Sequence, residues 1–464
     1  MKLFNALHNL LCGPLITLHF PGGNEVGLSL MILFLIPAGI LFTVLTRGLP
    51  VRLFPEMVHV STEKKTSTTE NSISGLQALM IATATRVGTG NLVGVVAAVS
   101  VGGAGAVFWM WITALLGCST AFIEATLAQL HKQKDPLYGG YRGSPAHYIH
   151  NTMTAKKPRR YSAIAILFAA SGLICWASVA LIVSNSISTA FVNAFQIPSM
   201  VSTVVLVALA AVIILRKNTT VKVLDIMVPI MAVCYFVITL FIIFKNFGQL
   251  PAVFTRIFQE AFGLRPIAGG TLGTVIITGI QRGLFSNEAG SGSAPCASAA
   301  ADVSHPAKAG LVQSFGVFID TIIVCTCSAM IMLLAPESVT AGLEGMSLLQ
   351  AAMQYHLGDF GVIFIFVILW LFGFSTFIGL LFYSRPITSY LFGDTWTSQT
   401  VVKIFMLIML FMGDLATYNF VWQLNDISIS LMTIINILII VPISGQALKC
   451  LKEYEALRKE GKRP

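Results

Sequence analysis

Long apolar stretches recur along most of this 464-residue chain. A helix needs about 20 apolar residues to cross the hydrocarbon core of a bilayer. Only 11% of the residues are charged, against about 25% in ordinary soluble domains, so a soluble core cannot bury this much apolar surface. The sequence predicts an all-α integral membrane protein. We expect eleven transmembrane helices, at 26–46, 73–101, 106–130, 161–195, 200–215, 223–244, 268–300, 310–335, 360–392, 401–416 and 427–448.

The basic residues are distributed unequally between the two predicted sides of the membrane. One set of alternate loops and the carboxyl-terminal tail hold 23 of the 29 Lys and Arg residues, and the other set holds four. Basic loops stay in the cytoplasm. The sequence therefore predicts a multi-pass protein of the cell inner membrane with residues 1–25 outside as a lead-in helix and residues 449–464 as a cytoplasmic tail. This arrangement explains the net charge of +9 without a nucleic acid partner.

The predicted helices divide into one extra helix at 26–46 and two sets of five, at 73–245 and 268–448. An odd number of helices in each half makes the two halves inverted, an arrangement found in many secondary transporters. The opening helix of each half is interrupted by glycine and polar residues, at 86–91 and at 282–292. Paired interruptions of this kind indicate a binding site at the bilayer midplane.

Gly88-Thr89-Gly90-Asn91 interrupts the opening helix of the first half. If the helix unwinds there, the freed amides at the start of the following half-helix suit a carboxylate, and the freed carbonyls suit a hard cation. The alternative is close helix packing through small residues. The matching interruption in the second half favours unwinding.

Ser286, Asn287 and Glu288 form a polar cluster inside the opening helix of the second half. Charges inside the membrane are costly and face the protein interior. We expect Arg282 to pair with Glu288, in a structural role. The role of Glu288 in binding stays open at this point, whereas Asn287 and its backbone suggest a binding function.

Three further charged groups, Arg86, Glu124 and Asp320, are expected to stabilise the fold without touching a ligand. Arg86 lies at the first interruption, and its expected partner is Glu124 or Asp320, both of which also lie in predicted membrane helices. In a medium of low polarity such charges are usually paired with one another.

Ser375 and Thr376 are adjacent hydroxyl residues in the middle of the helix at 360–392. Both can reach a cation held between two helices, since hard cations prefer oxygen ligands. The alternative is that the hydroxyls bond back to their own helix, and this pair taken alone favours that alternative.

Several blocks resemble the alanine/glycine:cation symporter family. The most specific is the run 102–117, beginning Gly-Gly-Ala-Gly-Ala-Val-Phe-Trp-Met-Trp. The runs 87–91, 282–290 and 292–295 are similar to the two broken helices of the family. The similarity extends over nearly the whole chain, with the blocks in the order that the family has.

The resemblance implies the leucine-transporter-type fold, with a 5+5 inverted repeat and one extra amino-terminal helix. It implies import of a small neutral amino acid, of the alanine or glycine type, with sodium as the coupling ion and no other cofactor. The expected partners are therefore this amino acid, sodium and the lipid bilayer. The resemblance assigns Thr89, Gly90 and Asn91 to the substrate carboxylate, and it assigns the hydroxyls of Ser375 and Thr376, with backbone near Thr85 and Gly88, to sodium. From the polar cluster at the second interruption, we expect Ser286 and Asn287 to bind the substrate as well.

Two positions depart from the family pattern: Val183 replaces a common Gln, and Leu380 replaces a common aromatic residue. Both departures imply a pocket for a different or larger substrate. Two alternatives to the sodium symporter are a proton-coupled carrier, titrating on Glu288 or Glu124, and a receptor or channel that does not perform coupled transport. The sequence contains no nucleotide loop, catalytic triad or metal cluster, so we do not expect an enzyme.

Overall fold

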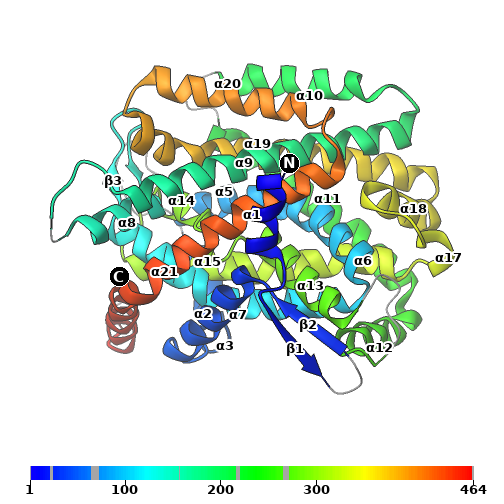
Figure 1. The fold of residues 1–464 in the computed structure, drawn as a ribbon, viewed down its shortest axis with the longest axis horizontal. Coiled ribbons are helices and arrows are strands. Elements are labelled where there is room, and N and C mark those ends of the chain that lie inside the picture. The colour runs from blue at the N-terminus through cyan, green and yellow to red at the C-terminus, as the bar shows by residue number, and fades with distance from the viewer. Residues whose placement is uncertain are drawn as a thin grey trace.

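Apolar sequence forms helix along most of the chain, because a helix satisfies its own backbone hydrogen bonds without water. The computed structural model describes residues 2–20, 24–63, 73–155, 157–215, 220–264 and 271–461. Figure 1 shows a bundle of crossing helices with a small hairpin at its edge.

The elements of the first part of the chain are the following. They are α1 (Lys2–Cys12), β1 (Ile16–Phe20), β2 (Asn24–Leu28), α2 (Leu30–Leu45), α3 (Leu49–Arg52), α4 (Phe54–Ser61), α5 (Gly75–Thr85), the π-helical η1 (Arg86–Gly94), α6 (Val95–Gly102), α7 (Gly105–Leu130), β3 (Gln133–Lys134), β4 (Tyr141–Arg142), α8 (Pro145–Thr154), α9 (Ala163–Phe195), α10 (Ser199–Ile214) and α11 (Thr220–Lys245).

The second part continues in the same way. Its elements are η2 (Phe247–Gln249), α12 (Leu250–Ala261), α13 (Leu272–Asn287), α14 (Ala294–Ser298), α15 (Pro306–Val317), the π-helical η3 (Phe318–Cys325), α16 (Thr326–Leu333), α17 (Glu337–Thr340), α18 (Gly345–Leu357), α19 (Asp359–Phe392), α20 (Trp396–Met412) and α21 (Tyr418–Lys459).

Among the described residues, seven helical segments are long and apolar enough to cross a membrane. They are Gly75–Gly102, Gly105–Leu130, Ala163–Phe195, Ile226–Lys245, Pro306–Leu333, Asp359–Phe392 and Tyr418–Lys459. Three shorter apolar helices, α2, α10 and α20, accompany them. The predicted multi-pass membrane fold is confirmed, while the count of eleven spans and the inverted 5+5 repeat stay predictions.

Local sequence explains where several of these helices begin. Ser74 caps α5: its hydroxyl accepts from the Gln77 amide at 3.0 Å, and the Gln77 side chain accepts from the Ser74 amide at 2.9 Å. This reciprocal capping box satisfies two amides that would otherwise have no partner. The buried Glu260 carboxylate does the same for α7, because it accepts from the amides of Ala104 at 2.7 Å and Gly105 at 3.3 Å.

Three long helices, α9, α19 and α21, cross the middle of the bundle (Figure 1). α7 packs against both α13 and α15, so it links the two halves of the chain. α10 and α20 lie side by side along one edge, where α20 also contacts α9. The broken segments η1 and α13 contact one another and lie inside this framework.

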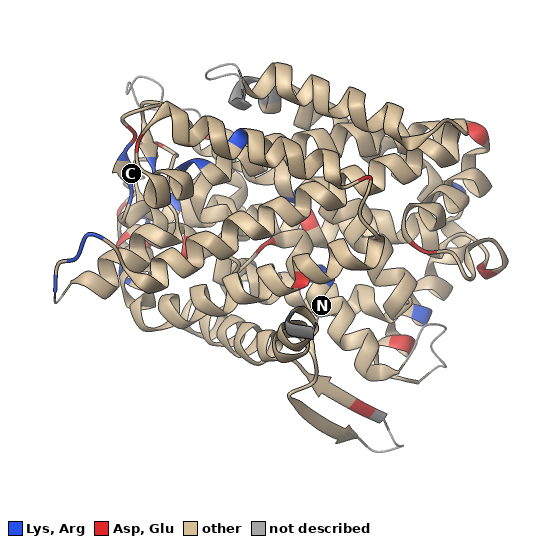
Figure 2. Cartoon of the chain, turned by 45° about the horizontal axis from the view of Figure 1, so that its top comes forward, with Lys and Arg blue, Asp and Glu red and all other residues tan. Residues whose placement is uncertain are grey.

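Figure 2 shows Lys and Arg gathered mainly at the end of the bundle that carries the carboxyl terminus. This segregation fits the predicted orientation, which stays a prediction because orientation also depends on the membrane. Several residues used in that prediction lie outside the described residues, namely those at 64–65, 156, 216–217, 265 and 462–463.

The amino-terminal region differs from the prediction. The helix expected at 26–46 begins at Leu30, and Val26 lies in β2, which pairs with β1 in an antiparallel hairpin. The expected lead-in helix covers Lys2–Cys12 and is followed by β1. A second short hairpin, β3–β4, follows α7, so two antiparallel hairpins accompany the helices of the described chain.

The last helix is longer than predicted. α21 has 42 residues and runs from Tyr418 to Lys459, through the boundary expected at Leu448. Near its carboxyl end the Tyr454 hydroxyl donates to Glu56 at 2.6 Å, and Arg458 lies 3.2 Å from the same carboxylate. These contacts attach the end of α21 to α4, and therefore extend the helix beyond its apolar portion.

Candidate functional site

The opening helix of the first half is broken, as predicted. Val87 has φ −75° and ψ 67°, and Gly88 has φ −148° and ψ −128°, values that no helix contains. Every residue from Arg86 to Gly94 is buried. The break therefore leaves non-helical backbone inside the protein, where it is shielded from lipid.

The opening helix of the second half is also broken, as predicted. α13 ends at Asn287, and the Glu288 amide donates to the Leu284 carbonyl at 2.8 Å to close the helix. Glu288 has φ +55°, and Gly290 and Gly292 have φ +89° and +86°. Glycine adopts these left-handed conformations without a steric cost, so the sequence Gly-Ser-Gly permits the turn before α14.

Two glycines bring the breaks close to their neighbours. A Cβ atom added at Gly90 would lie 3.0 Å from Cα of Ser286, in the second opening helix. A Cβ atom added at Gly88 would collide with the Thr376 hydroxyl of α19. The missing side chains thus allow η1 to contact both α13 and α19.

The residues predicted to bind sodium are only partly gathered. The hydroxyls of Ser375 and Thr376 lie 3.5 and 3.2 Å from the carbonyl of Ala84, and the Thr376 hydroxyl accepts from the Thr89 amide at 3.3 Å. Ser375 also donates to the carbonyl of Phe372 on its own helix at 2.9 Å. These oxygens converge on the last turn of α5, beside Gly88.

Thr85, also assigned to sodium, directs its side chain elsewhere. Its hydroxyl lies 2.7 Å from that of Tyr383, 2.9 Å from the carbonyl of Ala82 and 3.4 Å from the Glu288 carboxylate. Thr85 follows Ala84, whose carbonyl contacts the Ser375–Thr376 pair, but the Thr85 hydroxyl itself bonds elsewhere.

The residues predicted to bind substrate line the junction between the two breaks. The Asn91 side-chain amide donates to the backbone carbonyl of Asp320 at 2.8 Å, and the Ser286 hydroxyl donates to the Asp320 carboxylate at 2.9 Å. Asn287 instead caps the backbone of its own turn, because its oxygen accepts from the Ala289 amide at 3.0 Å. Asn91 and Ser286 therefore meet at η3.

Asp320 itself was expected to have only a structural role. The structure places it, fully buried, between two of the predicted substrate residues. A carboxylate in the middle of an apolar span was the signal in the sequence, since such groups usually mark ligand or ion pathways.

Several buried polar atoms at this junction have no hydrogen-bond partner among the described residues. They include Thr89 Oγ1, Asn91 Oδ1, Asn287 Nδ2 and Asp320 Oδ1. Buried polar groups are paired in the great majority of cases. These atoms therefore have unused hydrogen-bonding capacity at the junction between the two breaks.

Glu124 supports the second break from α7. Its two oxygens accept from the Gly290 amide at 3.2 Å and from the side-chain amide of Asn436 at 3.0 Å. Asn436 also donates to the Gly290 carbonyl at 2.9 Å and accepts from the Tyr148 hydroxyl at 2.5 Å. The turn at Gly290 is thus held by side chains of α7 and α21, and Tyr148 of α8 supports Asn436.

The expected pairing of Arg282 with Glu288 is wrong. Arg282 forms a buried, two-pronged ion pair with Asp426 of α21, at 3.0 and 2.7 Å, and its guanidinium lies 4.1 Å from the centre of the Trp422 ring. Glu288 instead contacts the hydroxyls of Thr85 and Tyr383.

The expected pairing of Arg86 with Glu124 or Asp320 is also wrong. Its Nη1 donates to the side-chain oxygen of Gln313 at 3.1 Å, and its Nε and Nη2 have no hydrogen-bond partner in the part of the chain that the structure describes.

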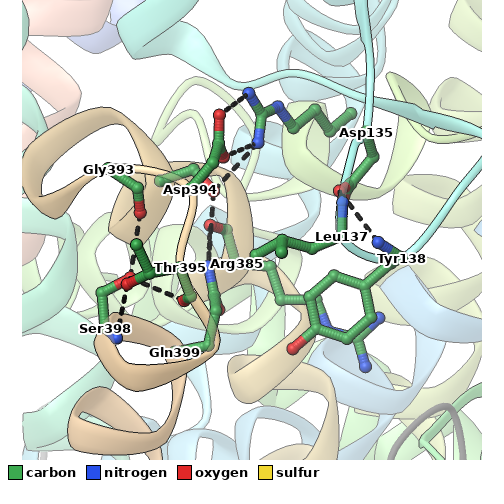
Figure 3. A network of polar contacts seen from close by, with 11 residues as sticks. Asp135, Leu137, Tyr138, Arg385, Gly393, Asp394, Thr395, Ser398 and Gln399 are labelled. Atoms are coloured by element: carbon green, nitrogen blue, oxygen red, sulfur yellow. Dashed lines mark hydrogen bonds and ion pairs between the residues drawn. The ribbon is translucent and has the colours of Figure 1, made fainter.

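A separate network of polar contacts lies at the end of the bundle that carries β3 and α8 (Figure 3). Arg142 of β4 forms a two-pronged ion pair with Asp394, which follows α19. The hydrogen bond from Arg142 holds the pKa of the Asp394 carboxyl below its usual value. The Arg385 guanidinium lies 4.1 Å from the centre of the Tyr138 ring. The network therefore attaches the β3–β4 hairpin to α19.

His147 of α8 lines a cleft of about 270 Å³ beside this network. Burial, with a smaller contribution from nearby Arg142 and His150, lowers the pKa of His147 to about 4 from the usual 6.5. Between pH 6.5 and pH 4 the unfolded chain takes up a proton that the folded chain does not, so the folded state loses stability as the pH falls.

We predict that replacing His147 with Gln will reduce this acid sensitivity. The wild-type protein should lose at most about 1.4 kcal/mol per pH unit through this group, and the variant should not. Melting temperatures in detergent at pH 7, 6, 5 and 4 measure the difference. The control is His19→Gln, at an exposed imidazole. Equal pH profiles for wild type and His147→Gln would contradict the prediction.

The sequence is similar to known proteins over nearly its whole length. The sequence profile of the sodium:alanine symporter family matches residues 22–464. The probable sodium/glutamine symporter GlnT of Bacillus subtilis is 40% identical over 94% of this chain and 90% of its own length. The amino-acid carrier protein AlsT of the same organism is 39% identical over 93% and 90%. The sodium/alanine symporter AgcS of Methanococcus maripaludis is 32% identical over 92% and 95%.

Proposed function

Because this chain belongs to the sodium:alanine symporter family, we propose that it imports a small neutral amino acid together with sodium across the cell inner membrane. The observation that carries the proposal is the meeting of two broken helices in the protein interior, where several buried polar atoms have no hydrogen-bond partner within the part of the chain that the structure describes. The amino acid is of the alanine or glycine type. The amino terminus lies outside and the carboxyl terminus in the cytoplasm.

The backbone at Thr89, Gly90 and Asn91 receives the substrate carboxylate. The amides at the start of the helix that continues through α6 carry partial positive charge, which attracts an anion. Ser286 and Asn287 complete the site from the second break. In the present structure the Thr89 amide donates to Thr376, so this amide exchanges that contact for one with the substrate.

Sodium binds where the hydroxyls of Ser375 and Thr376 meet the end of α5, with backbone oxygens near Thr85 and Gly88. Oxygen ligands suit a hard cation. The ion links α19 to the broken helix, and so it favours the conformation in which these elements are close. A ligand shifts a conformational equilibrium only by binding one state more tightly. The contact of sodium with both α19 and the broken helix provides this difference in affinity.

Transport follows by alternating access, in which two inverted five-helix halves move about the central site. The membrane potential favours inward movement of each sodium ion by about 2.3 kcal/mol per 100 mV. The buried side chains of Val183 and Leu380 are the departures from the family pattern, and a larger substrate such as glutamine is therefore included among the candidates.

A proton-coupled carrier is the second candidate. Glu288 is a buried carboxylate at the second break, and it contacts Thr85 of the first opening helix. A proton on this group would alter the link between the two breaks. Glu124 is the other candidate, because it holds the turn at Gly290.

Uptake into proteoliposomes tests both proposals. Radiolabelled alanine, glycine, serine and glutamine are each supplied with an inward sodium gradient, with a proton gradient alone, or with neither. Accumulation only with the sodium gradient supports the symporter. Accumulation at acid pH without sodium supports the proton-coupled carrier, and ligand binding without accumulation would reject both in favour of a receptor or channel.

We predict that Asn91→Ala abolishes uptake while the protein stays folded and inserted in the membrane. The variant removes a side chain that joins the first break to η3. Initial uptake rates, compared at equal amounts of reconstituted protein, measure the effect. The matched control is Asn246→Ala, where the side chain bonds only to the carbonyl of Ile242 among the described residues, at the end of α11. Full activity in the Asn91 variant would reject this position for the site.

A further inference from the structure

The cleft that His147 lines lies at the end of the bundle where Lys and Arg gather (Figure 2), and its volume is about 270 Å³. Its walls are formed by β3, β4, α8, the segment that leads into α9 and the last turn of α19. The described side chains that line it comprise two guanidinium groups, two imidazoles, two carboxamides, two phenols and one hydroxyl, with no carboxylate among them. Hydrogen-bond donors that include guanidinium groups suit an anion.

Arg142 is held in a fixed orientation beside this cleft. Both of its terminal nitrogens bind the Asp394 carboxylate, and Nη1 also donates to the Ser389 hydroxyl at 3.0 Å. Its Nε is buried and has no hydrogen-bond partner in the described part of the chain. Because buried polar groups are paired in the great majority of cases, this nitrogen has unused hydrogen-bonding capacity.

Arg160 contributes a positive charge that no side chain of the cleft lining balances. It is exposed, and its guanidinium lies 5.3 Å from the centre of the Tyr161 ring. Asp394 balances the charge of Arg142, whereas the lining offers Arg160 no carboxylate. The two guanidinium groups together therefore leave one excess positive charge, which equals the single negative charge of a phosphodiester.

The two imidazoles of the cleft are oriented through their Nδ1 atoms. Nδ1 of His147 lies 2.9 Å from the Ser144 hydroxyl, and Nδ1 of His150 lies 3.0 Å from the Tyr390 hydroxyl. The Tyr390 hydroxyl also accepts from the Ser162 amide at 3.2 Å. Nε2 is the second hydrogen-bonding atom of each ring. These side chains are thus positioned before a ligand binds, which lowers the cost of ordering them.

The cleft lies where two apolar helices end. Tyr161 lies just before α9, and Ser389 and Tyr390 lie in the last turn of α19; both helices are long and apolar enough to cross a membrane. Tyrosine is enriched at the level of the lipid headgroups. The first turns of α9 also expose the apolar side chains of Ile164 and Leu167. A phosphate in this cleft would therefore lie at headgroup depth, next to side chains that suit acyl chains.

We propose that this cleft is a binding site for a phosphate group, with Arg160, Arg142 and the two imidazoles as its donors. Its volume is slightly below the range of about 300–1,000 Å³ found for small-molecule pockets, so it accommodates a headgroup phosphate and not a nucleotide. A phospholipid and free inorganic phosphate share this chemistry. The single excess charge and the position beside the apolar helices favour an anionic phospholipid.

This site is separate from the junction of the two helix breaks, and it does not depend on the proposed transport function. The phosphate would contact both the segment before α9 and the last turn of α19. A ligand that binds the folded state stabilises it, so occupancy should strengthen the packing at this end of the bundle.

Thermal unfolding of the purified full-length protein in a neutral detergent tests the proposal. One arm replaces sodium chloride by sodium phosphate at constant sodium concentration. The other arm adds dioctanoyl phosphatidylglycerol, with dioctanoylglycerol as the matching lipid without phosphate. We expect phosphatidylglycerol to raise the melting temperature in a saturable way and dioctanoylglycerol to leave it nearly unchanged.

Two neighbouring arginines give a matched pair of variants. Arg160→Gln removes the excess charge, and we expect the half-saturating concentration of the stabilising probe to rise at least about 10-fold, as for the loss of a hydrogen bond to a charged group. Arg159→Gln makes the same change at an exposed residue that is not among those lining the cleft, and it should bind as wild type does. Arg160→Lys keeps the charge and should lose less affinity than Arg160→Gln.

The two arms also identify the source of the phosphate. A saturable response to phosphatidylglycerol assigns the site to a lipid headgroup, and a saturable response to inorganic phosphate alone assigns it to the free anion. Phosphate also stabilises proteins without binding to a site, so the difference between the two arginine variants is the deciding measurement. Stabilisation by neither probe, or the same affinity in Arg160→Gln and Arg159→Gln, would overturn the proposal.

Discussion

Thr376→Val should remove most sodium-driven uptake. Valine has the shape of threonine without its hydroxyl, and this hydroxyl lies 3.2 Å from the Ala84 carbonyl and 3.3 Å from the Thr89 amide. The variant loses a proposed sodium ligand and the contact that joins α19 to the first break. A hydrogen bond to a charged group is worth about 1.5–3 kcal/mol, so the half-saturating sodium concentration should rise roughly 10- to 100-fold.

The matched control lies on the same helix. Thr388 is also buried in α19, and its hydroxyl has no partner among the described residues. Thr388→Val should retain uptake and its sodium dependence. Uptake rates over a series of sodium gradients measure both variants. A Thr376 variant with the wild-type sodium dependence would show that the hydroxyl bonds only to neighbouring protein groups and does not bind sodium.

Arg282→Met should destabilise the protein by about 3–5 kcal/mol, because it leaves a buried charge without its partner. Asp426 is 8% exposed, and both of its oxygens are bound by Arg282. The substitution also removes the guanidinium from the Trp422 ring, which packs edge-on against Phe285 at 4.9 Å. Thermal unfolding in detergent, followed by the fraction that remains monodisperse, gives the measurement.

The double variant Arg282→Met with Asp426→Leu separates the charge effect from the loss of packing. Removing both charges eliminates the unpaired carboxylate, so most of the lost stability should return. A double variant that is as unstable as the single one would show that packing on Trp422, and not the unpaired charge, accounts for the effect.

Features that depend on local sequence were predictable. Gly88, Gly90, Gly290 and Gly292 marked both helix breaks correctly, because glycine changes the backbone at its own position. The position of Ser375 and Thr376 beside the first break also agrees with the prediction, although their role in binding sodium stays a proposal.

Features that depend on distant partners were not predictable. Asp426 lies 144 residues from Arg282. Nothing in the sequence near Arg282 indicates that its partner is the distant Asp426 and not the nearby Glu288. The β1–β2 hairpin was missed for a similar reason: Val26 begins an apolar run, but its strand is defined by pairing with Leu18. The free oxygen of Asp320 can be recognised only once its neighbours are in place.

The 42-residue helix α21 is about 60 Å long at 1.5 Å per residue, whereas a bilayer with its headgroups measures about 40–45 Å. Its amino-terminal half carries Asp426, and its carboxyl end is attached to α4 through Glu56. A tilt of α21 at one membrane surface therefore also moves its end at the other surface. A fluorophore near Lys459 would therefore report a rearrangement that begins at the opposite end of the helix, near Tyr418.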